Sequence, residues 1–369
     1  MNPIIKWPGG KSREIKNIQH LIPPFNRYIE PFFGGGALFF NLEPEHAEIN
    51  DISQNLIEFY TQIQIQDNRL HNLLICYSNS FNNLILQFRN RDEELTDLFY
   101  NYQQNRIDIT KYFADMVNEM YGDNIDEFNE QIILNLDEFK SSLVRYATDK
   151  FCRTVTNHNK KPFSNKDLIE NLVTGFASGY YMYFRKVFND INLNRIDAPS
   201  LQYKIANFYF VREYCYGSMF RYNRNGEFNI PYGGMSYNKK NMTTKIDKMF
   251  NENIQTLFHN TNIHNQDFED FLNNIHPHEG DFIFLDPPYD TDFSDYEGRD
   301  FTLQDQERLA NALINTEANF ILVIKNTDFI RGLYEDHFNI ISFDKQYTYN
   351  VRSRNNRDVE HLIITNLPV

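Results

Sequence analysis

The chain has 369 residues and a formal net charge of −14, so it can bury a large core and hold two lobes, but it cannot be basic over its whole surface. Cys76, Cys152 and Cys215 are widely spaced and form no C-x-x-C pair, which argues against a disulfide framework or a zinc site. No apolar run reaches membrane-spanning length and the N-terminus does not resemble a signal peptide, so we expect a cytoplasmic protein without a membrane partner.

The first informative segment is Lys6-Trp7-Pro8-Gly9-Gly10-Lys11-Ser12. Its Gly-Lys-Ser ending is typical of a phosphate-binding loop. That loop, however, needs a preceding strand and a glycine at the position where this chain has Ile5. We therefore disfavour a nucleoside-triphosphate site here.

Residues 27–51 predict a strand, a glycine turn, a helix and a second strand. The turn is Gly34-Gly35-Gly36, and glycines there let a ligand approach the backbone and let the helix pack on the strand. Asp51 ends the second strand at a spacing that suits a ribose diol. A dinucleotide fold is a rival interpretation, but its G-x-G-x-x-G pattern needs a small residue where Phe39 stands.

The middle of the chain predicts helices of changing charge. Residues 60–140 are acidic, with apolar residues at helical spacing in 68–74, 93–102 and 126–143. Residues 140–166 are basic, which we interpret slightly more readily as a solvated helix face than as a DNA contact. The small and aromatic residues 175–181 predict helix packing rather than a ligand loop.

Residues 220–233 predict a β-hairpin that turns at Asn225-Gly226, a strong two-residue turn signal. An alternating α/β pattern follows residue 251. It predicts helices and strands in this order: helix 254–260, strand 261–264, strand 282–285, helix 303–315, strand 320–325, and a closing strand pair, 340–347 and 359–366.

The strand 282–285 runs into Asp286-Pro287-Pro288-Tyr289. Neither proline can donate a ladder hydrogen bond, so this segment predicts a rigid turn at the carboxyl end of a buried strand, where open α/β sheets bind ligands. A carboxylate, backbone carbonyls and an aromatic ring in that place can hold a planar base that carries an amino group.

Together these motifs resemble the Dam-type (D12 class) DNA adenine-N6 methyltransferases over roughly residues 1–60 and 205–369. The resemblance implies an α/β, Rossmann-like S-adenosylmethionine-dependent methyltransferase sheet formed by residues 1–60 and 251–369. It also implies an inserted, mostly helical target-recognition lobe, residues 61–250, that carries the β-hairpin. Double-stranded DNA is the implied partner, S-adenosylmethionine the cofactor, and no metal is required. A restriction–modification system with a cognate restriction endonuclease is one setting that fits.

The same resemblance implies roles for individual residues. The catalytic group is Asp286, Pro287, Pro288 and Tyr289. The cofactor group is Trp7, Lys11, Phe32, Phe33, Gly34, Gly36, Asp51, Asp267 and Phe268. The DNA-binding group is Lys6, Tyr216, Arg221, Asn223 and Pro231. Two plainer interpretations stay open: Asp267 suits a helix cap, and Trp7 suits the core.

The expected activity is methylation of N6 of a flipped adenine in double-stranded DNA. Cytosine N4, RNA and protein glutamine are alternative substrates, and a catalytically inactive DNA-binding homologue is another alternative. Asp286 rather than serine disfavours cytosine N4, and the intact Asp51 and Asp286 disfavour an inactive homologue. Gly234 stands where the enzymes that read GATC carry a basic residue, and Arg224 and Asn225 also depart from their pattern, so we do not expect GATC specificity.

Overall fold

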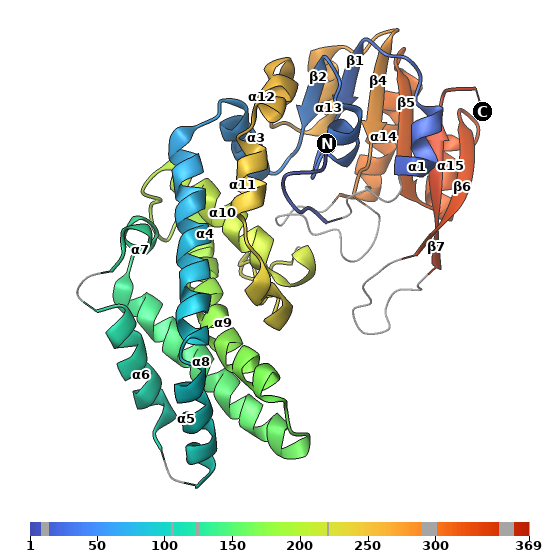
Figure 1. Cartoon of the computed structure of the whole chain (residues 1–369). Helices are drawn as coiled ribbons and strands as arrows, with labels where there is room; N and C mark the ends of the chain where they lie inside the picture. Colours follow the sequence, from blue (N-terminus) through green and yellow to red (C-terminus); the bar gives the residue numbers. More distant parts are fainter. Residues whose placement is uncertain are drawn as a thin grey trace. The chain divides into compact units, whose positions relative to one another are not determined.

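The computed structural model describes residues 1–8, 15–104, 107–122, 125–219, 221–288, 301–346 and 358–368 (Figure 1). The chain forms two compact units. The first contains Met1–Gln66, Phe220–Tyr222 and Phe250–Val369, and the second contains Asp67–Met219 and Asn223–Met249. No helix in the described part of the chain is both long enough and apolar enough to cross a membrane.

The first unit is built on a seven-stranded sheet in the order β3-β2-β1-β4-β5-β7-β6. Its strands are β1 Arg27–Glu30, β2 Ala47–Asn50, β3 Thr261–His264, β4 Asp281–Leu285, β5 Asn319–Lys325, β6 Asn339–Gln346 and β7 Asp358–Thr365. The pairs from β3 to β5 are parallel, and β7 is antiparallel to both of its neighbours. The strand order reverses between β1 and β4, which is where doubly wound sheets bind ligands.

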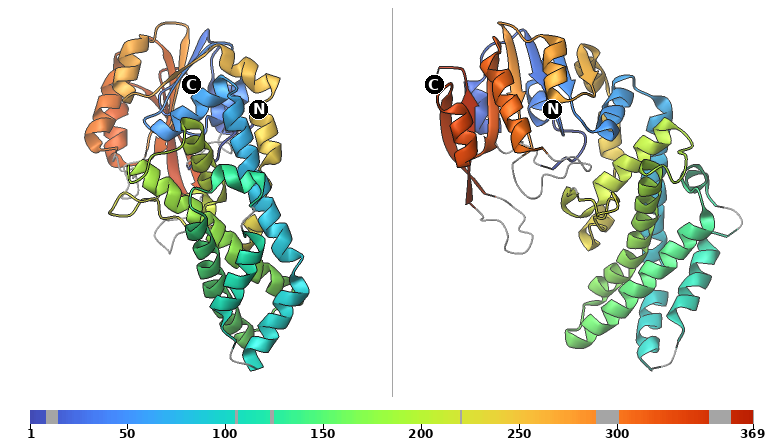
Figure 2. Two further views of the ribbon diagram at one scale, coloured as in Figure 1. Left: turned by 90° about the vertical axis from the view of Figure 1, so that its left-hand side faces the viewer. Right: turned by 180° about the vertical axis from the view of Figure 1, so that it is seen from behind.

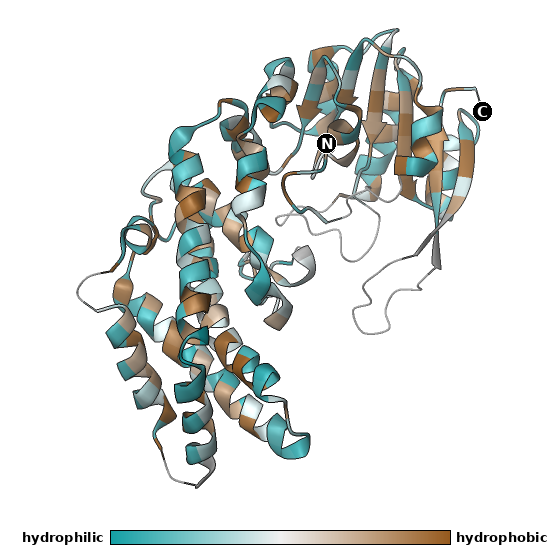
Figure 3. Ribbon diagram, in the orientation of Figure 1, coloured by the Kyte–Doolittle hydropathy of each residue, from teal (hydrophilic) through white to brown (hydrophobic). Residues whose placement is uncertain are grey.

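Side chains alternate between the two faces of this sheet. Ile29 of β1 and Ile283 of β4 join a buried cluster with three helices, and Figures 1 and 2 show these helices on one side of the sheet. The helices are α13 (Phe268–Ile275), α14 (Leu303–Ile314) and α15 (Asp328–Tyr334). The neighbouring residues Tyr28 and Phe282 face the other way, where the ring of Tyr28 lies 6.3 Å from that of Phe39 in α2 (Ala37–Leu42). Hydrophobic residues concentrate along the central strands, as expected for a sheet buried on both faces (Figure 3).

The helical segments of the first unit are α1 Ile15–Ile18, η1 Gln19–Leu21, α2 Ala37–Leu42, α3 Gln54–Gln64, α12 Glu252–His259, α13 Phe268–Ile275, α14 Leu303–Ile314 and α15 Asp328–Tyr334. The alternating α/β elements predicted after residue 251 are confirmed, with ends that shift by one or two residues. The expected domain boundary after residue 60 falls inside α3. This helix stays with the sheet to its end, because the amide of Gln64 donates to the carbonyls of Phe258 and Thr261 at 3.0 and 2.6 Å.

The second unit is mostly helical. Its helical segments are α4 Asn68–Arg89, α5 Asp92–Gln104, α6 Ile109–Met120, α7 Glu127–Ile132, α8 Leu136–Lys160, α9 Asn165–Asn192, α10 Leu201–Tyr214, η2 Tyr216–Ser218, η3 Met235–Lys239 and α11 Thr243–Met249. The packing role predicted for residues 175–181 is confirmed, since they lie within α9. A Cβ atom at Gly179 would come within 2.7 Å of the backbone of α8, so glycine permits the close approach of these two helices.

One predicted helix is wrong: residues 126–143 form the two helices α7 and α8 instead of one. Asp126 caps α7 and Asn135 caps α8, each by accepting a hydrogen bond from a backbone N–H of the first turn. Between the two helices, the backbone N–H groups of Leu134 and Asn135 both donate to the hydroxyl of Tyr183 at 2.9 Å. The Asn135 cap and the hydroxyl of Tyr183 therefore stabilise the break between α7 and α8, which the spacing of apolar residues alone does not reveal.

The predicted β-hairpin is present only in part: within residues 221–233, all of which the structure describes, the chain turns at Asn225-Gly226, and single bridge residues, Tyr222 and Phe228, flank the turn in place of longer strands. The N–H of Asn223 donates to the carbonyl of Glu227 at 2.9 Å. Beyond the turn, the side chain of Asn189 binds both backbone polar groups of Phe228, at 2.8 and 3.0 Å. The returning arm is thus held at Phe228 by a side chain of α9, and at Tyr232 by an antiparallel backbone bridge to Cys215.

Candidate functional site

The carboxyl ends of β1, β2 and β4 bring three predicted motifs to one edge of the sheet. The glycine turn follows β1, Asp51 follows β2, and Asp286 follows β4. Because β1 lies between the other two strands at the point where the order reverses, the two acids flank the glycine turn. Strand pairing alone thus brings the glycine turn, Asp51 and Asp286 to the same edge of the sheet.

The glycine turn adopts a backbone that requires glycine. Gly34 and Gly36 have φ angles of 50° and 62°, in the left-handed region. A Cβ atom at Gly34 would lie 2.8 Å from Cδ1 of Trp7, so the half-buried indole packs directly over the turn. Phe33 is buried, and its ring would clash with any side chain at Gly36. The turn therefore consists of backbone without side chains, packed between the rings of Trp7 and Phe33.

Asp51 is tied to the glycine turn. Its Oδ2 accepts a hydrogen bond from the N–H of Gly34 at 2.8 Å, and its Oδ1 accepts one from the N–H of Ser53 at 2.9 Å. The preceding Asn50 is buried, and its amide donates to the carbonyls of Pro31 and Gln266 at 3.0 Å. These bonds fix the position of the Asp51 carboxylate beside the glycine turn.

Glu30 is a buried acid between these groups. Its side chain is 2 % exposed and accepts a hydrogen bond from the hydroxyl of Tyr28 at 2.8 Å. Burial raises the pKa of Glu30 well above its ordinary value; the bond from Tyr28 lowers it, and the charges of Asp286 and Asp51 raise it further. Asp286 and Asp51 thus both lie near enough to act electrostatically on the same buried carboxyl group.

The turn after β4 is anchored by a residue of α14. Asp286 and Pro288 are half-buried and Pro287 is buried. The side-chain amide of Gln306, itself fully buried, donates to the carbonyl of Pro288 at 3.2 Å. Two predicted site residues, Tyr289 and Lys11, lie outside the described residues.

Asp267 caps α13 by accepting a hydrogen bond from the N–H of Glu269 at 3.0 Å, so the capping interpretation of this residue is confirmed. Its carboxylate also binds Arg308 of α14 at 2.5 Å. Phe268 is only 4 % exposed, its ring lies 5.4 Å from that of Phe32, and the guanidinium of Arg308 lies 4.8 Å from its centre. Asp267 and Phe268 thus have structural partners, and their contact with a cofactor stays a prediction.

The predicted DNA-binding residues differ in how exposed they are to solvent. Tyr216 is 46 % exposed and Arg221 is exposed, while Lys6 is half-buried. The carbonyl of Pro231 accepts a hydrogen bond from the N–H of Tyr216 at 2.9 Å. The amide of Asn223 is engaged within its own turn, bonding to the backbone of Asn225 and Glu227 and to the Glu227 carboxylate.

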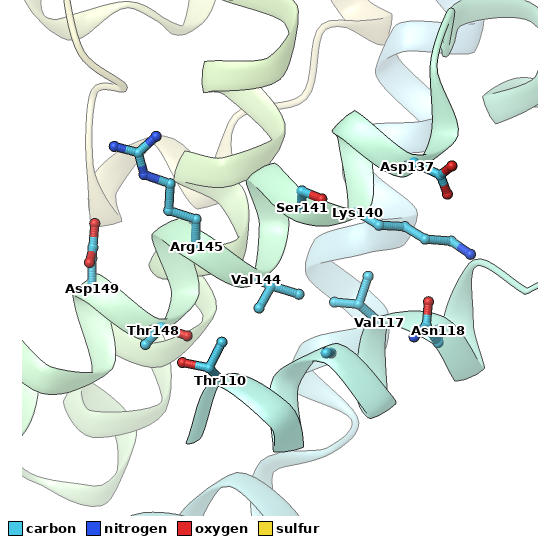
Figure 4. Close-up of a pocket in the computed structure, with 11 residues that line it drawn as sticks. Thr110, Val117, Asn118, Asp137, Lys140, Ser141, Val144, Arg145, Thr148 and Asp149 are labelled. Carbon is cyan, nitrogen blue, oxygen red and sulfur yellow. The ribbon is translucent and has the colours of Figure 1, made fainter. Parts of the chain in front are cut away.

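A groove of about 560 Å³ lies between α6 and α8 of the second unit (Figure 4). Val117 and Val144 form its apolar floor, and Lys140 and Arg145 lie along its length. None of the predicted site residues lines it. The groove therefore belongs to the second unit's own helix packing and adds nothing to the arrangement at the sheet edge.

Sequence reasoning missed the residues that hold the site rather than face a ligand. They are Glu30, Asn50, Arg308 and Gln306. Glu30 could have been noticed as an acid at the end of a buried strand. The signal at Gln306 was weaker: it is a polar residue on the apolar face of the helix predicted over 303–315.

The sequence of this chain is similar to a known protein family and to several known proteins. Residues 7–172 and 159–349 match the family described as D12 class N6 adenine-specific DNA methyltransferase. A type II methyltransferase of Paramecium bursaria Chlorella virus NC1A is 23% identical over 99% of this chain and 100% of its own length. A type II methyltransferase of Methanocaldococcus jannaschii is 27% identical, over 99% of each chain. A DNA adenine methylase of Vibrio cholerae is 22% identical over 96% of this chain and 92% of its own.

The buried Glu30 makes stability depend on pH. Its folded-state pKa is raised above the unfolded value of about 4.3, so its contribution is fully present below that value and is lost as pH rises. Glu30→Gln removes this titration and keeps an acceptor for Tyr28. Urea unfolding from about pH 5 to about pH 8 should therefore show wild type losing stability relative to the variant. A constant difference would contradict the buried-acid assignment, and the exposed Glu45→Gln is the control.

Proposed function

The chain belongs to the D12 class N6 adenine-specific DNA methyltransferase family, and from that premise we propose that Asp51 and Asp286 serve methyl transfer from S-adenosylmethionine to a flipped adenine. As a member of this family the chain is an adenine-specific DNA methyltransferase, an enzyme that needs a methyl donor. One observation carries the residue assignments, namely that the glycine turn, Asp51 and Asp286 meet where the strand order reverses.

The residues at the sheet edge suit S-adenosylmethionine. Gly34-Gly35-Gly36 presents backbone without side chains, and the indole of Trp7 packs against it, where a Cβ at Gly34 would clash. The Asp51 carboxylate, fixed by Gly34 and Ser53, would accept hydrogen bonds from ribose hydroxyls. Asp51 and Asp286 also supply negative charge, which favours a cationic ligand. We assign Trp7, Phe32 and Phe33 to the walls of this site, and Lys11 to the residues that contact the cofactor.

When bound, the cofactor supplies an activated methyl group, so the chain's own residues need only place and polarise the adenine amine. The lone pair of that amine is delocalised into the ring, which makes the nitrogen a poor nucleophile. Hydrogen bonds from the amine to the Asp286 carboxylate and the Pro287 carbonyl would favour a pyramidal nitrogen with its lone pair free. This combines positioning with electrostatic stabilisation in a partly buried site.

The target nitrogen is inaccessible inside a duplex, so the adenine must leave the base stack. We assign Tyr289 to stacking on the flipped base and Tyr216, which is 46 % exposed, to the gap that the base leaves behind. The second compact unit, Asp67–Met219 and Asn223–Met249, would be the target-recognition lobe. Its basic stretch 140–166 would contact phosphates, and Lys6, Arg221, Asn223 and Pro231 would lie at the recognition site.

A restriction–modification setting is supported by relatives named type II methyltransferases that match almost the whole chain. In that setting a cognate endonuclease cleaves the same sequence when it is unmethylated. Labelled methyl transfer to assorted duplexes, followed by nucleoside analysis, tests the proposal. It separates N6-methyladenine from N4-methylcytosine, and parallel RNA and protein substrates test the remaining alternatives.

Replacing Asp286 tests the catalytic assignment. Asp286→Ala removes the acceptor that polarises the amine, so the methyl-transfer rate should fall about a hundredfold or more while the protein stays folded. Single-turnover kinetics and circular dichroism measure the two effects. The exposed Asp328→Ala should keep wild-type activity. A rate for Asp286→Ala within about tenfold of wild type would remove Asp286 from the mechanism.

Replacing Asp51 tests the cofactor assignment. Asp51→Ala removes a charged acceptor of the ribose hydroxyls, which should weaken S-adenosylmethionine binding by about 1.5–3 kcal/mol. Asp51→Asn keeps one acceptor oxygen and should lose less. Calorimetric titration gives both affinities, and thermal unfolding of the same variants separates this loss from loosening of the Gly34 turn. Unchanged affinity in Asp51→Ala would reject the role.

Specificity should differ from GATC. Gly234 has φ 87° and ψ −167°, a backbone that residues with side chains avoid, so the loop is not arranged to present a basic base-reading side chain at this position.

Arg221 should still read one base pair, and Arg221→Ala should reduce discrimination at that base pair by about 1–3 kcal/mol. Mapping of methylated adenines in cells expressing each protein measures both. Methylation confined to GATC would contradict the expectation.

A further inference from the structure

Gln306 stands out among the inward-facing residues of α14. The residues that follow it on that face, Leu309, Ala310 and Leu313, are apolar and pack in the core. Gln306 is polar and its side chain is 0 % exposed. Its Nε2 lies 3.2 Å from the carbonyl oxygen of Pro288. Because a proline carbonyl can only accept, this contact also settles which end of the amide faces the turn.

The amide of Gln306 is not explained by packing. Its Oε1 atom is buried and finds no hydrogen-bond partner among the described residues. A buried acceptor left without a donor costs about 1–3 kcal/mol, whereas methionine of similar size would leave no polar atom unsatisfied. Destabilising arrangements of this kind persist where the site they support depends on them.

The turn that Gln306 contacts lacks the donors that usually hold a turn. Pro287 and Pro288 have no N–H groups, so the backbone between Asp286 and Tyr289 has few ways to fix itself. The bond from Gln306 supplies a donor from outside. Since α14 is packed in the core and begins with a Thr302 cap and capping box, the donor sits on a rigid element.

We propose that Gln306 is a positioning residue that holds the Pro288 carbonyl and thereby orients the Asp286 carboxylate and Pro287 carbonyl toward the target amine. This inference rests on the proposed function of Asp286. Gln306 touches neither substrate nor cofactor and acts through the turn alone. A misplacement of reacting groups by about 1 Å can cost about a hundredfold in rate, so losing one anchor should be visible in the chemical step.

Gln306→Met tests the proposal with little change in volume. The single-turnover rate constant for adenine methylation, at saturating duplex and S-adenosylmethionine, should fall about tenfold to about a hundredfold. Dissociation constants for both ligands should stay within about twofold, and the melting temperature should equal or exceed that of wild type, because the orphaned oxygen is gone. The control Leu313→Val, in the same helix, should lower the melting temperature and leave the rate unchanged.

Gln306→Glu supplies a readout that core filling would not move. A protonated glutamic acid can still donate to the Pro288 carbonyl, whereas the ionised form cannot. The rate of this variant relative to wild type should therefore decline as pH rises, while the Gln306→Met ratio stays flat. Asp286, Asp305 and Arg308 are present in all the proteins, so their titration cancels in the ratios.

A Gln306→Met rate within about twofold of wild type, or a Gln306→Glu ratio that does not change with pH, would overturn the proposal. If Gln306→Met fails to fold, the pH profile of Gln306→Glu decides. Failure of the proposed function looks different, because wild type itself would then leave adenine N6 unmethylated or Asp286→Ala would remain active. An inactive Asp286→Ala beside a fully active Gln306→Met would reject only the role of Gln306.

Discussion

The hydrogen bond from the Gly34 N–H to Asp51 is the constraint on which the site depends. It ties the end of β2 to the turn after β1, and the buried amide of Asn50 closes the same junction on its other side. The turn can come this close only because Gly34 adopts a left-handed backbone without a side chain. One carboxylate thus fixes the turn after β1 relative to the end of β2.

The site brings three carboxyl groups near one another, and one of them is buried. Glu30 lies buried between Asp51 and Asp286, and its raised pKa keeps the centre of this group closer to neutral than three free carboxylates would be. A cationic ligand at the sheet edge would meet two outer acids and a shielded inner one. This arrangement favours positive charge without placing three ionised groups in one low-dielectric space, which would weaken the fold.

Much of this architecture could be predicted from the chain itself. The runs around Ile283 and Ile321 predicted buried strands, and the turn glycines and the acid that ends β2 predicted the ligand edge. The structure of the second unit was harder to predict from the sequence. The break before α8 depends on Tyr183, and the arm after Gly226 depends on Asn189; each is far along the chain from the segment that it holds. Supporting residues such as Gln306 and Arg308 also escaped prediction, because their meaning lies in partners that only tertiary structure brings near.

The pairing of β1 with β4 joins residues that are far apart in the sequence, such as Tyr28 and Phe282. The residues of the second unit come between them along the chain. During synthesis, β1 and β2 are made early, with apolar faces and unpaired edges. Their sheet neighbours β3 and β4 are made only after the entire second unit. Such long-range contacts slow folding and leave strand edges open to aggregation. The lobe's helices, whose contacts are local, can fold during that interval. The central strand of the sheet is thus among the first parts made and the last completed.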